Sequence, residues 1–188
     1  GHDEWPKGPP VTTHGGAGFA EGSLFVGRAS NCRVWGHGTV RNSRGSGWRL
    51  NAEQGSEISG LDVEDCRWQL FRVDGKAHAV RNFTAKRGGM FNPTDRSAKV
   101  SNWCNAGTLK DAVDCLAENI LVGWSYCEGL GVTGTGNRLR NIQIHNCMSA
   151  ALYLNNSGPA DIDGLLMTHD GLTHLRGGGP AGGLIVTN

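Results

Sequence analysis

The stretch that decides the fold is LRNIQI at residues 139–144, where apolar and polar residues alternate around a central asparagine. The same pattern, apolar–x–Asn/Gly–apolar–x–apolar, recurs as ISGLDV at 58–63, VRNFTA at 80–85 and IDGLLM at 162–167. Looser copies are AENILV at 117–122, VSNWCN at 100–105 and, with one or two added residues, VWGHGTV at 34–40. Such alternation gives an extended strand one buried face and one wet face.

The spacing of these copies is that of a solenoid. Their central residues are 36, 60, 82, 102, 119, 141 and 164, with steps between 17 and 24 residues. A leucine-rich repeat of this length would show several leucines and a helical half, and a β-propeller blade needs about twice the length. Only residues 108–119 could form a short helix. The spacing therefore predicts stacked coils of short parallel strands about 4.8 Å apart.

A second strand follows the corner in most copies, as in WRL at 48–50, FRV at 71–73 and LYL at 152–154, with weaker cases around Val132 and Leu175. Stacked coils give equivalent positions the same environment. We therefore expect Cys66, Cys127 and Cys147 to share one corner as packed free thiols. We also expect the asparagines to form a ladder, because asparagine tolerates left-handed backbone and can bond to its counterpart.

The repeated pattern resembles that of right-handed parallel β-helix proteins of the pectate-lyase-like superfamily, over about residues 30–176. We therefore predict an all-β, single-stranded right-handed parallel β-helix of about seven coils. The parallel β-helix domain would cover residues 30–188. Residues 1–29 would form an N-terminal extension or cap that includes a lead-in strand at 24–26. The resemblance implies that the outward strand faces bind a polysaccharide, as in lyases, hydrolases, epimerases and phage tailspikes.

Composition narrows the possible partners. The chain has 188 residues, a formal net charge of +1 and 19% charged residues, without a basic cluster, so we expect no nucleic-acid partner. No apolar run approaches the length of a membrane helix, so we expect no membrane partner. The six cysteines form no CxxC and no zinc-like spacing with histidine, so we predict no metal and no cofactor. We expect the protein in the extracellular space or on a virion surface.

One outward face carries candidate catalytic groups. Alternation points Asp62 and Glu64 outward on one strand, roughly 6–7 Å apart. Arg41, Glu64 and Lys86 should lie in line on adjacent coils. Paired carboxylates beside cations suit hydrolysis, elimination or epimerisation of glycans. The candidate catalytic residues are Asp62 and Glu64 as acid and base, Lys86 or Arg41 neutralising a uronate, and His145 as an auxiliary. The alternative is a surface ladder of charges that stabilises neighbouring coils.

The second-strand face offers Arg49, Arg72, Asn92, Thr133, Tyr153 and Arg176. Arginine pairs with carboxylates and aromatic rings stack on sugars, although these arginines could simply keep the wall soluble. Trp124 and Tyr126 could form a stacking platform or pad a corner. The candidate substrate-binding residues are Arg41, Arg49, Arg72, Trp124, Tyr153 and Arg176. His169, Asp170 and His174 could form an acid–base or metal pair, but three suitably placed metal ligands are not evident.

Two functions from different classes remain open. The first is polysaccharide recognition, with catalysis uncertain because the Trp-x-Asp-His motif of pectate lyases and an outward aspartate cluster are missing. The alternative is a structural spike, fibre or surface module, as in a phage virion, that assembles as an oligomer. The C-terminal run GGLIVTN at 182–188 predicts the start of an eighth coil. We therefore expect a partner subunit, as in a trimer, or a continuation of the chain to cover that end.

Overall fold

The computed structural model describes residues 25–43, 45–66, 68–88, 105–125, 128–147, 150–168 and 183–187, and they contain strands but no helix. The strands are β1 (Phe25–Gly27), β2 (Arg33–Arg41), β3 (Trp48–Gln54), β4 (Glu57–Glu64), β5 (Phe71–Lys76), β6 (Ala79–Lys86), β7 (Asn105–Val113), β8 (Leu116–Gly123), β9 (Glu128–Thr135), β10 (Asn137–His145), β11 (Leu152–Ser157), β12 (Ala160–Thr168) and β13 (Leu184–Thr187).

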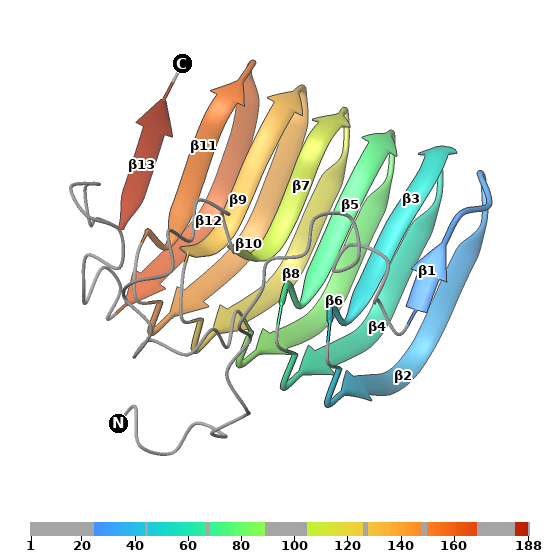
Figure 1. Ribbon diagram of the computed structural model, residues 1–188. Helices are drawn as coiled ribbons and strands as arrows, with labels where there is room; N and C mark the ends of the chain where they lie inside the picture. Colours follow the sequence, from blue (N-terminus) through green and yellow to red (C-terminus); the bar gives the residue numbers. More distant parts are fainter. Residues whose placement is uncertain are drawn as a thin grey trace.

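These strands alternate between two parallel sheets. Sheet A has the order β1-β3-β5-β7-β9-β11-β13, and sheet B has the order β2-β4-β6-β8-β10-β12. In Figure 1 sheet A runs upward in front and sheet B downward behind while the chain moves from right to left, which makes a right-handed coil. The predicted parallel β-helix is confirmed, with about five turns in place of seven.

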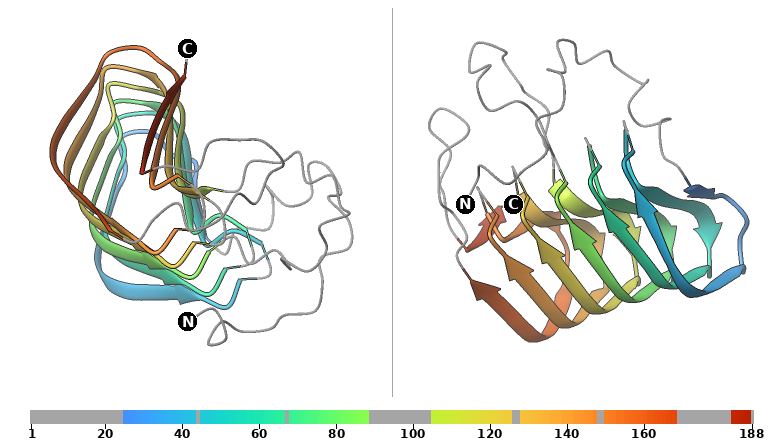
Figure 2. Two further views of the ribbon diagram at one scale, coloured as in Figure 1. Left: turned by 90° about the vertical axis from the view of Figure 1, so that its left-hand side faces the viewer. Right: turned by 90° about the horizontal axis from the view of Figure 1, so that it is seen from below.

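Each strand of sheet B bends at the repeated Asn or Gly, so its two halves form two sides of the coil (Figure 2). The bend requires left-handed backbone, with φ of 56° at Asn82, 53° at Asn119 and 48° at Asn141. Glycine serves the same corner at Gly60 and Gly164. The Asn119 amide donates to Asn82 and the Asn141 amide donates to Asn119, both at 2.9 Å. The predicted asparagine ladder is confirmed.

The core lies between the sheets and consists of rows of inward apolar side chains. Trp48, Phe71 and Phe83 form its aromatic centre, with ring centroids 5.0–5.3 Å apart. Each ring is at least 96% buried, and burial of large aromatic surfaces dominates the stability of such a core. Val63 is buried and Leu61 packs against the core, so the residues between and after them, Asp62 and Glu64, face outward as predicted.

A second ladder, not predicted from the sequence, closes the corner between sheet A and sheet B. Each backbone N–H donates to the side chain of the equivalent residue in the next coil: Cys32 to Ser56 at 3.3 Å, Ser56 to His78 Nδ1 at 3.0 Å, His78 to Cys115 Sγ at 3.4 Å and Cys115 to Asn137 at 3.1 Å. The four side chains that accept are buried, so the ladder satisfies backbone groups that water does not reach.

The prediction that the copy of the pattern around Asn102 forms a coil of its own is wrong. Strand β6 pairs directly with β8, so one coil runs from Asn82 to Asn119, and residues 89–104 lie outside the described residues. The expected short helix at 108–119 is also wrong, because these residues belong to β7 and β8. Residues 184–187 form β13, which pairs with β11, and do not begin an eighth coil. Of the predicted cap, residues 25–27 form β1, paired with β3.

The cysteine corner is confirmed for two members and corrected for the third. Cys66 and Cys147 are both buried at this corner, and burial raises the pKa of Cys66 to about 12. The N–H of Trp124 bonds to the carbonyl of His145, which places Ser125 in the coil position next to Cys147. Ser125 therefore occupies the position predicted for Cys127, which lies outside the described residues. Cys32 is free but exposed, while Cys115 is a third buried thiol.

Candidate functional site

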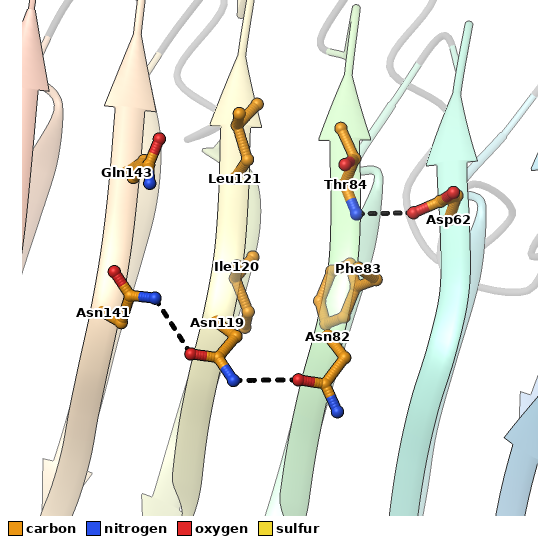
Figure 3. Close-up of a pocket in the computed structure, with 9 residues that line it drawn as sticks. All are labelled: Asp62, Asn82, Phe83, Thr84, Asn119, Ile120, Leu121, Asn141 and Gln143. Atoms are coloured by element: carbon orange, nitrogen blue, oxygen red, sulfur yellow. Dashed lines mark hydrogen bonds between the residues drawn. The ribbon is translucent and has the colours of Figure 1, made fainter.

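The outer face of sheet B carries a groove across successive coils (Figure 3). It consists of two adjoining hollows of about 260 Å³ and about 130 Å³, which share Asp62 and Thr84. The larger hollow is lined by Asp62, Asn82, Phe83, Thr84, Asn119, Ile120, Leu121, Asn141 and Gln143. The smaller one is lined by Thr39, Asp62, Val63, Glu64, Thr84 and Lys86. The groove is thus lined both by polar side chains and by the edges of apolar ones.

Strand register explains why these side chains form a row. Sheet B pairing aligns Thr39 with Asp62, Thr84 with Leu121, and Leu121 with Gln143. Four of these residues lie two positions after the Asn or Gly of the corner, and Thr39 lies three positions after Gly36. All five side chains point outward, one per coil. Successive rungs are roughly 4.8 Å apart, the spacing of paired strands. The channel therefore presents hydroxyl, carboxylate, apolar and amide groups at regular intervals.

Asp62 is held in place by the backbone of the next coil. Direct pairing of β4 with β6 is interrupted between Ser59–Arg81 and Val63–Ala85. In this interval the N–H of Thr84 donates to Oδ1 of Asp62 at 2.6 Å, so the carboxylate replaces a missing backbone acceptor (Figure 3). One oxygen of the predicted catalytic Asp62 is thereby engaged in the fold, while the side chain remains part of the groove wall.

Glu64 is the centre of a charge network. The prediction that Arg41, Glu64 and Lys86 lie in line is confirmed by the strand register. Glu64 forms an ion pair with Arg41 at 3.3 Å and accepts a hydrogen bond from Arg87 at 2.7 Å. Its two oxygens therefore already face guanidinium groups.

Arg87 was missed by the sequence reasoning because it lies one residue past the repeated pattern. It also donates to Asp65 at 2.8 Å, and the hydrogen bond with Asp65, followed by Glu64, raises the pKa of Arg87 above its ordinary value. Its backbone is left-handed, with φ of 56°, at the same corner position as Asp65 and Trp124. The central coils thus place bulky functional side chains where asparagine or glycine is the least strained choice.

Lys86 lies beside an aromatic ring. Its ammonium is 5.7 Å from the centroid of Trp124, a cation–π contact, and it forms no ion pair with any described residue. Trp124 is 38% exposed. In the next two coils the same row continues with Gly123 and His145. The His145 ring bonds to the Thr168 hydroxyl, so it faces away from the carboxylate pair.

Two arginines on the outer face of sheet A are engaged in ion pairs. Arg49 and Arg72 both donate to Asp74, at 3.0 Å and 2.6 Å, and all three side chains are at most 21% exposed. Tyr153 is only 8% exposed, which does not favour its predicted use as a stacking surface. The observed row is Arg49, Arg72, Thr108, Gly131, Tyr153 and Ile185.

That row corrects part of the predicted one. Thr108 takes the place given to Asn92, Gly131 the place given to Thr133, and Ile185 the place given to Arg176. Gly131 replaces Thr133 because Ser125 occupies the corner two residues before Cys127, and Thr108 and Ile185 belong to strands that begin later in the chain than the repeat spacing predicts. The residues Asn92, Tyr126, His169, Asp170, His174 and Arg176 lie outside the described residues.

The described residues contain no cluster of three or more His, Cys, Asp or Glu side chains that could hold a metal ion. Within the same residues there is also no helix long and apolar enough to cross a membrane. The chain matches no protein-family model, no curated protein and no solved structure.

Proposed function

We propose that this protein is a polysaccharide-recognising β-helix whose outer sheet B face binds an extended glycan across the coils. The observation that carries the proposal is the groove itself, which continues over β4, β6, β8 and β10. A rung spacing of roughly 4.8 Å is comparable with the length of one sugar ring, so consecutive rings could meet equivalent positions. The resemblance of the repeat to the pectate-lyase-like superfamily supports the same function.

The lining residues suit sugar chemistry. Asp62 and the amide oxygen of Gln143 can accept hydrogen bonds from sugar hydroxyls, and the Gln143 and Asn141 amides can donate them. Leu121 offers an apolar surface to the C–H face of a ring. Lys86, which lacks an ion-pair partner among the described residues, favours a glycan that bears carboxylates, because its ammonium at the edge of the groove can pair with a sugar carboxylate.

The geometry favours binding over catalysis. One oxygen of Asp62 accepts a hydrogen bond from the Thr84 N–H, and the Glu64 carboxylate forms ion pairs with Arg41 and Arg87. A general acid or base must be able to exchange a proton with the substrate, and these contacts compete with that exchange. Catalysis by Asp62, Glu64, Lys86 and His145 stays a prediction, tested by depolymerisation assays of Glu64→Gln.

A binding screen over neutral and uronate-containing polysaccharides, followed by calorimetry, tests the proposal. Leu121→Arg fills the groove and removes its apolar surface, so it should lower affinity for a neutral glycan by about tenfold or more. Lys86→Gln should lower affinity for a uronate polymer about fivefold, the scale of a partly exposed ion pair, and leave neutral glycans unchanged.

Lys110→Gln is the matched control, because Lys110 is an exposed lysine of β7 on the other sheet. It should bind like the wild type. Absence of binding across the screen, or unchanged affinity in a folded Leu121→Arg variant, would contradict the proposed function.

A structural module is the second candidate function, and one observation favours it. The terminal coils leave inward apolar side chains uncovered, including Val34 at 37% and Val186 at 62% exposure. Exposed core positions and open sheet edges invite association with another chain.

A further inference from the structure

An exposed tryptophan occupies a corner where the backbone disfavours it. The strands β2, β4, β6, β8 and β10 are each followed by a left-handed residue whose N–H donates to a carbonyl of the next coil: Asn42, Asp65, Arg87, Trp124 and Asn146. Asparagine suits such a backbone, whereas a bulky side chain there is an outlier. Trp124 has a φ of 54° and is 38% exposed, so the corner itself does not explain this residue. Backbone strain of this kind clusters at functional positions.

The Trp124 ring lies at the edge of the groove, beside its lysine. Lys86 lines the smaller hollow, and its ammonium is 5.7 Å from the centroid of the ring. The two residues belong to adjacent coils, because Lys86 aligns with Gly123, which directly precedes Trp124. Gly123 contributes no side chain that could separate the ammonium from the ring. Leu121, on the same strand as Gly123, lines the larger hollow.

The ion pairs around the ring leave Lys86 available to an anion. Arg41 and Arg87 both pair with Glu64, and Arg87 also pairs with Asp65. Lys86 forms no ion pair within the part of the chain that the structure describes. Its cation–π contact with the ring keeps the ammonium at the groove without neutralising its charge. A sugar carboxylate can therefore pair with Lys86 without displacing a carboxylate of these residues.

We propose that Trp124 and Lys86 form one subsite for a uronate ring at the edge of the groove. The C–H face of the sugar stacks on the exposed part of the indole, and its carboxylate pairs with the Lys86 ammonium. Tryptophan offers a large and rigid apolar surface at a low cost in conformational entropy. The subsite rests on the proposed glycan binding, and it assigns the acidic sugar to one place along the groove.

Trp124→Asn tests the subsite, because Asn42 and Asn146 show that asparagine serves the same corner. The variant should remain folded, with a urea midpoint close to that of the wild type, since relief of the left-handed strain offsets the lost ring contacts. Calorimetry uses the uronate-containing polysaccharide that binds best in the screen, together with its carboxyl-reduced form. Affinity for both should fall about tenfold, the scale of a lost aromatic anchor.

A double-variant cycle tests whether the ring and the lysine serve the same sugar. In the wild type, Lys86→Gln should lower affinity for the uronate polymer about fivefold and leave the carboxyl-reduced form unchanged. In the Trp124→Asn background the same change should cost about twofold or less, because the sugar is no longer held beside the lysine. Losses that multiply in the double variant would place the two side chains in separate subsites and overturn the proposal.

Trp35→Leu is the matched control. Trp35 is 66% exposed and has the Arg33 guanidinium 5.5 Å from its ring centroid, but it lines neither hollow. It should bind like the wild type. A readout on the wild type needs no variant to fold: the indole N–H signal of Trp124 should shift in NMR spectra when the uronate polymer is added, and that of Trp35 should not.

The outcomes separate the subsite from the function on which it rests. A folded Trp124→Asn variant with wild-type affinity, or an indole signal of Trp124 that does not move while the polymer binds, would identify the ring as corner padding. Either result overturns the subsite and leaves glycan binding in place. A wild type that binds no glycan in the screen overturns both.

Discussion

The outer faces of the two sheets are built from the same coils but differ in what they leave open. On sheet A, two arginines share Asp74 and Tyr153 is buried. On sheet B, the central row forms a groove, and Lys86 and Trp124 stay accessible at its edge. The two outer rows therefore differ in their side chains, since ion-paired arginines lie on sheet A and an open groove lies on sheet B.

Removing Asp74 should have the largest effect of the changes that probe this contrast. Asp74→Ala leaves Arg49 and Arg72 mostly buried without their acceptor, which should lower the free energy of unfolding by about 2–3 kcal/mol. Urea denaturation with an unchanged m value measures it. Asp62→Ala on the open face should cost about 1 kcal/mol, because only one backbone N–H loses its partner. Equal losses would contradict this contrast between the two faces.

Two glycines, one on each face, sharpen the same contrast. A Cβ at Gly131 would lie 1.6 Å from the Asn105 amide nitrogen, so Gly131→Ala should destabilise by about 2 kcal/mol through overpacking. A Cβ at Gly123 would meet nothing closer than 3.7 Å, and its backbone is not left-handed. Gly123→Ala should therefore stabilise by about 0.5 kcal/mol. Thermal unfolding measures the change in stability of both variants, and changes of the same sign would refute the comparison.

The exposed asparagine ladder should be the least costly to break. Asn119→Ala removes hydrogen bonds with Asn82 and Asn141 and places alanine in left-handed backbone, for about 1 kcal/mol in total. Asn119→Gly keeps the backbone preference and loses only the bonds, so it should cost less. Chemical denaturation of both variants separates the two terms. A larger loss for glycine than for alanine would show that the backbone conformation is not what asparagine supplies.

Much of the fold could be predicted from sequence because sheet B is regular. The repeat at residues 58–63, 80–85 and 139–144 identified the corner, the inward rows and the outward line of Arg41, Glu64 and Lys86. Inward and outward strand positions alternate between apolar and polar residues, and the left-handed corner selects asparagine or glycine, so both features can be recognised in the sequence. The same reasoning named candidate residues on the outer faces of both sheets, and the groove lies on that of sheet B.

The remaining features leave little trace in the pattern. The segment at 100–105 fits the repeat by composition, yet the chain passes from β6 to β8 without a strand of sheet B there. The corner at Ser125, two residues before the predicted Cys127, moved Thr133 out of its predicted row. The ladder from Ser56 through His78 to Asn137 uses a different residue type in each coil, so no repeated letter reveals it. Some contacts, such as that of Glu64 with Arg87, join positions of adjacent coils that are not equivalent in the repeat, so the repeat pattern does not reveal them.

The central claim is that the sheet B groove is the binding face, and NMR titration with a glycan found by the screen tests it most directly. Backbone and side-chain amide signals of Thr84, Leu121 and Gln143 should shift most as the glycan is added. Signals of Arg49, Arg72 and Lys110 should stay in place. Shifts confined to sheet A, with the groove residues unchanged, would contradict the account.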